Sequence, residues 1–242
     1  MKKNLTLTIL ALAVVAALPV ARADDGGGPF ESSNTHILSD GGPDGWGRGW
    51  SYSAAAAPEF ARVGGLGYSG ASARGIGLNA AAANGNFSVD AGLDDLGGGQ
   101  SGVEFRWLNI TAGMNYAIRP FDRFTFSPRL EIGRTGFAGP GAHANYIAAG
   151  GTAAYQITSR LVLAAQLMRG ATDGATGATG LRGPGGMYQS SGLSLVFAHP
   201  VGTPGDMTLA YQNRRFFVDS LPSGGDQYLR ARVVSVGYSL PF

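Results

Sequence analysis

The sequence has no cysteine, and only 14% of its 242 residues are charged. Without cysteine no disulfide can stabilise the chain, so packing, a β-sheet or a membrane must do so. The formal net charge of +2 is too small to indicate a nucleic-acid-binding protein. Three histidines without cysteine give little support to a transition-metal site, and no motif indicates another cofactor.

Long apolar runs are confined to the N-terminus. Residues 5–20 are mostly apolar, follow two lysines and precede Ala21-Arg22-Ala23. This pattern predicts a secretory signal peptide over residues 1–23. A single-pass anchor is the alternative, although the run is short for a spanning helix. No later stretch has eighteen consecutive apolar residues, so a membrane-embedded mature chain would have to be a closed β-barrel.

Helix-forming patterns are scarce, whereas glycine is abundant, with 40 residues. Residues 24–57 are rich in Gly, Ser, Asp and Pro, which predicts an irregular N-terminal segment that is disordered or enters the barrel. From residue 58 to residue 242 the sequence alternates with period two. In the clearest example, Phe87 and Val89 fall on one face and Ser88 and Asp90 on the other.

The alternating segments predict an all-β, antiparallel, up-and-down barrel of about ten strands, with eight as the close alternative and twelve less favoured. A soluble β-sandwich also alternates, but these segments have the length of about ten residues that a tilted strand needs to cross a bilayer. Short turns also alternate with longer glycine-rich connections, as in outer-membrane barrels. The predicted strands are 60–70, 75–83, 86–95, 104–118, 123–135, 143–157, 160–169, 187–199, 206–218 and 228–242.

The last strand carries a recognisable pattern at Val236, Gly237, Tyr238, Leu240 and Phe242. It resembles the C-terminal signature of bacterial outer-membrane β-barrels, in which apolar residues alternate up to a terminal phenylalanine. The resemblance implies recognition by the barrel-assembly machinery. Pro241 departs from the pattern, because it cannot donate the final ladder hydrogen bond. An outer-membrane location would also make lipid or lipopolysaccharide a partner.

Charged residues on the polar face are predicted to meet inside the barrel, since buried charges must be paired. Such a network would either seal the barrel or tune a narrow pore. Arg230 and Arg232 have the lipid-facing parity instead, which would place Arg232 at the outer interface beside lipid phosphates or at a solvated loop base. The predicted lumenal residues are Asp90, Arg123, Arg129, Glu131 and Arg214.

Three functions are compatible with these patterns. The favoured one is a narrow channel, porin-like, or a structural surface protein. The second is an adhesin or receptor that acts through the loop at residues 171–186. The third is a protease or lipid A-modifying enzyme with Asp94, Asp95 and His143 at the outer rim. That third function is disfavoured, since the paired Asp-x-His element of the omptin proteases is absent and adjacent aspartates point to opposite faces.

Overall fold

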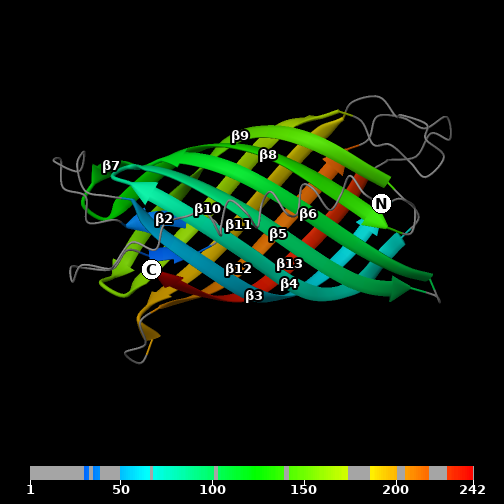
Figure 1. Ribbon diagram of the computed structural model, residues 1–242, viewed down its shortest axis with the longest axis horizontal. Coiled ribbons are helices and arrows are strands. Elements are labelled where there is room, and N and C mark those ends of the chain that lie inside the picture. Colours follow the sequence, from blue (N-terminus) through cyan, green and yellow to red (C-terminus); the bar gives the residue numbers. More distant parts are fainter. Residues whose placement is uncertain are drawn as a thin grey trace.

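The computed structural model describes residues 30–32, 35–38, 50–65, 68–100, 103–138, 142–173, 186–200, 205–217 and 228–241. Ten long antiparallel strands form a closed barrel, as the sequence predicted (Figure 1). Two strand pairings close the ring. The first strand of the barrel pairs with the last, and β6 (Val103–Tyr116) pairs with β8 (Phe124–Ala138). Among the described residues, no helix is long and apolar enough to cross a membrane.

The barrel strands run in chain order around the wall, so strands that follow each other in the chain are neighbours. The exception is the seam, where β3 (Ser51–Gly65) pairs with β13 (Tyr228–Pro241). A short strand, β7 (Ile118–Phe121), pairs with β8 beyond the end of β6. The barrel strands are β3 (Ser51–Gly65), β4 (Tyr68–Asn84), β5 (Phe87–Gln100), β6 (Val103–Tyr116), β8 (Phe124–Ala138), β9 (Ala142–Thr158), β10 (Leu161–Thr172), β11 (Met187–Ala198), β12 (Asp206–Phe217) and β13 (Tyr228–Pro241).

Side chains alternate between wall and lumen as the period of two predicts. On β8, Leu130 and Ile132 are exposed on the outer wall, whereas Arg129 and Glu131 are buried inside. Exposed large apolar side chains occur on the outer face of all ten barrel strands. Soluble monomers rarely expose apolar patches larger than a few hundred Å², so this surface is typical of a wall in contact with lipid.

The strand ends are arranged as predicted for a membrane barrel. Ser53, near the start of β3, pairs with Pro241 at the end of β13, and the turn at Gly85 and Asn86 lies at the same end of the strands. Gly85 has a φ of 59°, the left-handed conformation that such a tight turn requires. Long connections between β10 and β11 and between β12 and β13 lie at the opposite end.

Two boundaries differ from the prediction. The barrel begins at Ser51 instead of residue 58, because β3 and β4 have alanine and glycine at most inward positions and therefore show little contrast in the sequence. Two strands also extend past their predicted ends at residues 95 and 135, since β5 continues to Gln100 and β8 to Ala138.

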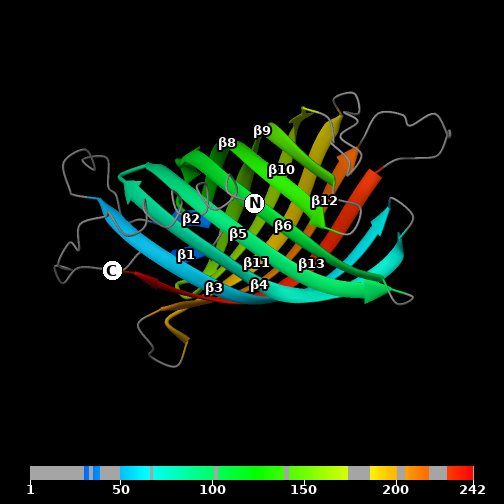
Figure 2. The ribbon, with the colours of Figure 1, turned by 45° about the vertical axis from the view of Figure 1, so that its right-hand side comes forward.

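A two-stranded hairpin precedes the barrel. It consists of β1 (Phe30–Ser32) and β2 (Thr35–Leu38), in the segment predicted to be irregular. The strand β1 lies next to β3, β11, β12 and β13. In both ribbon views the hairpin lies within the outline of the barrel, toward the end that carries the C-terminus (Figures 1 and 2). The predicted signal peptide, residues 1–23, lies outside the described residues.

The barrel lumen as the candidate functional site

The guanidinium of Arg129 is the centre of a buried ion-pair cluster on one side of the lumen. Its Nη2 atom donates to Asp90 at 2.8 Å, and its Nε atom donates to Glu131 at 3.0 Å. Asn115 bridges Arg129 and Asp90, while the Tyr146 hydroxyl donates to Glu131 at 3.0 Å. The Arg129 side chain is only 2% exposed, so these contacts replace its hydration almost completely.

A second ion pair crosses the lumen. Arg214 on β12 forms an ion pair with Asp94 on β5, and these strands are four places apart in the ring of ten. Asp94 also accepts a hydrogen bond from Asn109 at 3.0 Å. The side chains of both charged residues are largely buried. This pair ties facing parts of the wall together through the interior.

An aromatic layer fills the lumen toward the end with the long loops. Tyr146 stacks on Tyr188 with ring centroids 4.1 Å apart, and Phe216 contacts Tyr188 at 4.9 Å and Tyr146 at 5.7 Å. Trp107 completes the layer with its ring centroid 5.8 Å from that of Phe216. The spacings of 4.9, 5.7 and 5.8 Å around Phe216 lie in the range of favourable aromatic packing.

The aromatic layer reaches from wall to wall. Trp107 lies on β6 and Phe216 on β12, which are five places apart in the ring of ten strands and therefore on facing sides. Their exposed fractions are 1% and 3%. Leu96, Phe105, Leu229 and Val63 pack around them in the same apolar cluster. The layer is thus a packed core inside the barrel.

Two glycines make room for these inward side chains. A Cβ atom at Gly113 would lie 2.4 Å from Nη2 of Arg129, and one at Gly133 would lie 2.4 Å from the Tyr146 ring. Both glycines thus allow a large side chain to lie flat against the opposite backbone. Glycine at these two positions therefore follows from the size of the side chain on the neighbouring strand.

A cavity of about 50 Å³ lies in the lumen beside the Arg214–Asp94 pair. Three buried polar atoms in its lining make no hydrogen bond with the described residues: Oε2 of Glu59, Nε2 of Gln166 and Oγ1 of Thr208. This volume accommodates a few water molecules, which suffice to satisfy these atoms. It is far below the several hundred Å³ typical of pockets for organic ligands.

The predicted lumenal residues separate into three groups. Asp90, Arg129 and Glu131 lie together, and Arg214 lies with Asp94 in the second ion pair. The placement of Arg123 in the lumen was wrong: it lies exposed in the turn before β8. The period of two continues through this turn, so parity alone assigned Arg123 to the wrong environment.

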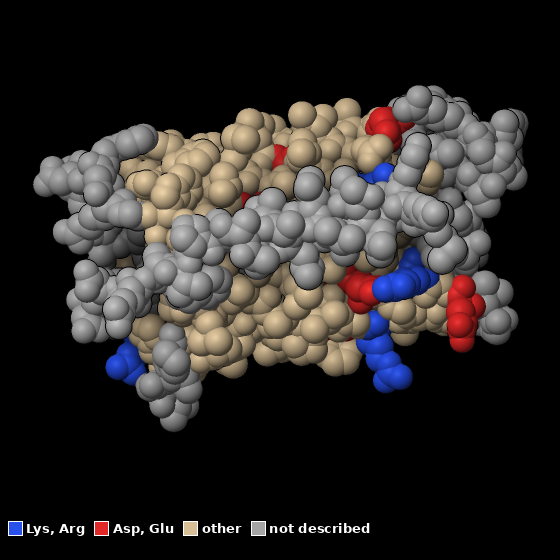
Figure 3. Space-filling model, in the orientation of Figure 1, with Lys and Arg blue, Asp and Glu red and all other residues tan. Residues whose placement is uncertain are grey.

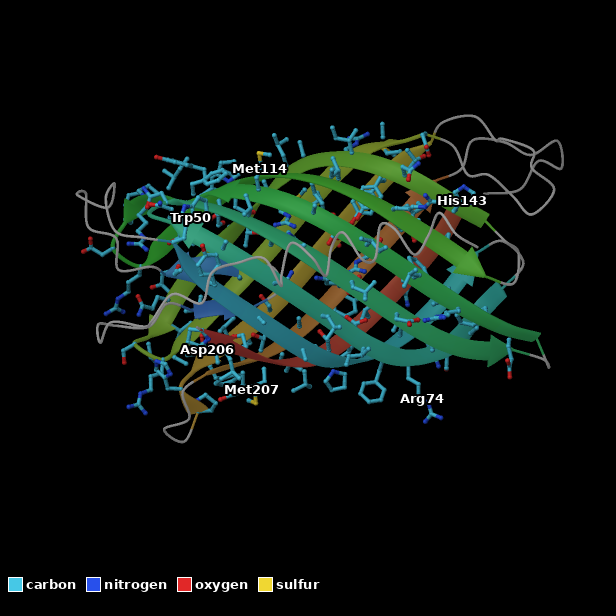
Figure 4. All side chains as sticks on the ribbon, in the orientation of Figure 1. Trp50, Arg74, Met114, His143, Asp206 and Met207 are labelled. Carbon is cyan, nitrogen blue, oxygen red and sulfur yellow. The ribbon has the colours of Figure 1, made fainter. Side chains whose placement is uncertain are left out.

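The rim residues considered for catalysis do not form a site. Asp94 points inward to Arg214, whereas Asp95 lies outside and pairs with Arg106. His143 lies at the end of the barrel opposite Trp50 (Figure 4). Register places it level with Asp95 but three strands away, about 14 Å along the wall at roughly 4.8 Å per strand. Among the described residues, no three His, Cys, Asp or Glu side chains form a group that could hold a metal ion.

Three residues of the predicted C-terminal signature lie on the outer wall. Val236, Tyr238 and Leu240 are exposed on β13, with Gly237 between them facing the lumen, while Phe242 lies outside the described residues. Most of the loop at residues 171–186, which the receptor hypothesis requires, also lies outside the described residues. Arg232 is exposed, and Arg230 donates a hydrogen bond to Asn213 at 2.8 Å.

Comparisons with known proteins give fold likenesses alone. No protein-family model matches the chain, and no curated protein matches it. The translocator domain of the autotransporter NalP from Neisseria meningitidis is 14% identical with a TM-score of 0.46, covering 83% of this chain and 92% of that one. Neisserial surface protein A is 10% identical with a TM-score of 0.43, covering 81% and 100%. Ail of Yersinia pestis is 14% identical with a TM-score of 0.35, covering 78% and 98%.

The fold class predicted from the sequence is confirmed by the closed antiparallel sheet itself. It is the architecture of a small outer-membrane β-barrel. Sequence reasoning missed Glu59, Asp94 and the four aromatic residues as lumenal groups. The alternation of β5 could have identified Asp94 as lumenal, because Asp94 lies four positions after Asp90 and so faces the same side of the strand.

Proposed function

We propose that this protein is a bacterial outer-membrane β-barrel with a closed lumen, and that it acts as a structural, surface-exposed protein and not as a solute channel. The apolar outer wall supports a membrane location, as do the predicted signal peptide and the C-terminal resemblance. Recognition by the barrel-assembly machinery belongs to the same proposal.

The contact between Trp107 and Phe216 carries the closed-lumen proposal. A conducting pore needs a continuous polar path, whereas these rings meet across the lumen within an apolar cluster. Exposing either side chain to a water-filled channel would cost about 1.5–3 kcal/mol in lost burial. The Arg214–Asp94 pair crosses the lumen as well, and separating two desolvated charges adds to that cost.

The polar interior favours a structural role for the charges. Each described lumenal arginine, Arg129 and Arg214, contacts at least one carboxylate directly. Charges that tune conduction line a water-filled path. Arg129 is instead enclosed by its partners, which supports the sealing interpretation.

The two alternative functions gain less support. The receptor hypothesis depends on the loop at residues 171–186, most of which lies outside the described residues. The enzyme hypothesis requires Asp94, Asp95 and His143 to act together, and the strands hold them on different faces and far apart. If His143→Ala changes neither lipid A nor a peptide substrate, the enzyme hypothesis is removed.

Ion flux from liposomes tests the closed lumen. The wild-type barrel is reconstituted with an entrapped potassium-sensitive dye and compared with the double variant Trp107→Ala/Phe216→Ala. We expect no flux above protein-free liposomes for the wild type and measurable flux for the variant. Leu163→Ala/Leu167→Ala, which truncates two lipid-facing side chains, is the matched control and should stay silent. Flux from wild-type liposomes above the protein-free level would contradict the proposal.

A further inference from the structure

Glu59 on β3 forms no ion pair with a described residue. It is 6% exposed and lines the small lumenal cavity, where its Oε2 atom makes no hydrogen bond with the described part of the chain. The guanidinium in this cavity, that of Arg214, pairs with Asp94 instead. A buried carboxylate without a partner is costly, so Glu59 indicates that something positive is held beside it.

A second carboxylate faces Glu59 across Gly77. A Cβ atom at Gly77 would lie 2.7 Å from Oε1 of Glu59 and 3.5 Å from Oδ1 of Asp94, so both groups border the space that the glycine leaves open. The register causes this approach, because Gly77 on β4 lies directly opposite Asp94 on β5. The bonds from Arg214 and Asn109 go to the other oxygen, Oδ2. Oδ1 of Asp94 therefore remains on the side of Glu59.

Negative charge exceeds positive charge around the cavity. Its lining has three carboxylates and one guanidinium, those of Glu59, Asp94, Glu131 and Arg214. The nearby Arg129 divides its contacts between Glu131 and Asp90. The outer wall offers no compensation on the face in Figure 3, because its middle carries almost no charged side chain. At least one further positive charge is therefore needed inside the lumen.

Two neutral side chains independently indicate a ligand in the same cavity. Gln166 on β10 and Thr208 on β12 are 7% and 6% exposed and line the cavity. Nε2 of Gln166 and Oγ1 of Thr208 make no hydrogen bond with the described residues. A hydroxyl oxygen can coordinate a cation, and an amide N–H can donate to a water molecule that does so. Water alone would satisfy these hydrogen bonds, but it would not offset the charge of Glu59.

The volume and the ligand set restrict the class of cation. A cavity of about 50 Å³ accommodates one small ion with a few water molecules and is too small for an organic ligand. Calcium takes roughly six to eight oxygen ligands, often from several carboxylates. Among the described residues, no three acidic or histidine side chains are grouped in that way. A singly charged ion that keeps part of its hydration fits better.

We infer that the lumenal cavity binds a partly hydrated monovalent cation of about the size of potassium, held by the carboxylate of Glu59. Oδ1 of Asp94 and the hydroxyl of Thr208 supply further oxygen ligands, and Gln166 donates to a water molecule bound to the ion. The ion offsets the charge that Arg214 and Arg129 leave uncompensated.

The cavity extends toward the barrel end that carries the chain termini. Ala55 and Ser239 pair across β3 and β13 near that end, and both line the cavity. Tyr188, which belongs to the aromatic layer, borders it on the other side. The site is thus a dead end for ions and goes beyond the closed-lumen proposal. It binds a cation without conducting it, so conductance recordings and ion binding test the two claims separately.

Urea unfolding of the full chain in phospholipid vesicles tests the inference. Potassium chloride replaces N-methylglucamine chloride at constant pH and ionic strength, so that only the size of the cation changes. A ligand that binds the folded state alone raises the folding equilibrium constant about elevenfold at about ten times its Kd. We expect the wild-type urea midpoint to rise by about 0.5 M or more at that concentration. Ammonium, which is similar in size to potassium, should act in the same way.

Glu59→Gln should abolish the potassium dependence, because the amide keeps the shape of the side chain and removes its charge. The matched control is Glu104→Gln, which removes an exposed carboxylate from the outer face of β6 and should respond to potassium as the wild type does. Heat-dependent gel migration checks the folding of each variant. If Glu59→Gln does not fold, Thr208→Val provides the same test, because losing one oxygen ligand should weaken potassium binding about tenfold.

Rubidium, which is similar in size to potassium and scatters anomalously, locates the ion. Crystals of the barrel grown in rubidium chloride should show an anomalous peak in contact with the Glu59 carboxylate, and crystals of Glu59→Gln should lack it. A wild-type stability that is independent of potassium, or a cavity without the peak, would overturn the inference. Stability that ignores potassium but falls as pH rises, and does so only when Glu59 is present, would overturn it in favour of a proton shared with Asp94.

Discussion

Replacing Arg129 with methionine should strongly destabilise the barrel. Methionine keeps much of the side-chain volume but removes the cation that both Asp90 and Glu131 contact. Those carboxylates are 7% and 8% exposed, so they cannot recover their hydration without opening the lumen. Breaking a buried ion pair by removing one partner costs about 3–5 kcal/mol, and we expect a loss of that size here.

Urea titration in phospholipid vesicles measures this loss through tryptophan fluorescence. With a dependence of about 1–3 kcal/mol per molar urea, the midpoint should fall by at least about 1 M. The matched control is Arg123→Met, which removes an exposed arginine from the turn before the same strand and should change stability by less than about 0.5 kcal/mol. The reasoning fails if the two variants lose the same stability, because the buried cluster would then contribute no more than a solvated arginine.

Three other predictions test separate parts of the structure. Gly133→Ala should lower the free energy of unfolding by about 1–3 kcal/mol, because the added Cβ would overlap the Tyr146 ring. Gly97→Ala, whose Cβ would meet open space, should lower it less. Equal losses for the two variants in urea titrations would contradict this packing. Ala56 and Tyr238 lie directly opposite each other across β3 and β13, so cysteines at these two positions should form a disulfide on oxidation, seen as a gel shift. The control pair, Ala56→Cys with Met114→Cys, should not cross-link. Cross-linking of both pairs alike would argue against the pairing of β3 with β13. Asp95→Asn should cost at most about 1 kcal/mol because Arg106 is 63% exposed, and a loss as large as that of Arg129→Met would show that exposure does not govern these ion pairs.

Much of the wall could be predicted from the sequence because a barrel strand has two unlike faces. Within β8, alternation separates Leu130 and Ile132 from Arg129 and Glu131, and the two pairs lie on the outer wall and in the lumen respectively. The same rule failed in two ways. It continued past the strand into the turn at Arg123, and it gave little signal in β3 and β4, where the inward residues are mostly small.

The contents of the lumen depend on contacts between distant strands, which local patterns do not contain. Trp107 and Phe216 meet from facing walls, and Arg214 reaches Asp94 over 120 positions of sequence. Inward parity was visible for each of these residues, but their height in the barrel depends on register and strand tilt. Glu59 was missed because the first strand was predicted to begin at residue 60.

The small lumenal cavity completes this picture of a filled interior. Its volume suits a few water molecules next to Glu59 and Gln166, and the aromatic layer lies on its loop-side boundary at Tyr188. Buried water of this kind is a normal part of polar protein interiors. The cavity is therefore consistent with a closed barrel.

Single-channel recording in planar bilayers tests the closed lumen most directly. Wild-type barrel, shown to be folded by its heat-dependent gel migration, is inserted and held at a series of voltages. The aromatic contact between Trp107 and Phe216 predicts no discrete conductance steps, and the variant Trp107→Ala/Phe216→Ala should produce them. Reproducible steps from the wild-type protein would contradict the closed lumen and restore the channel interpretation.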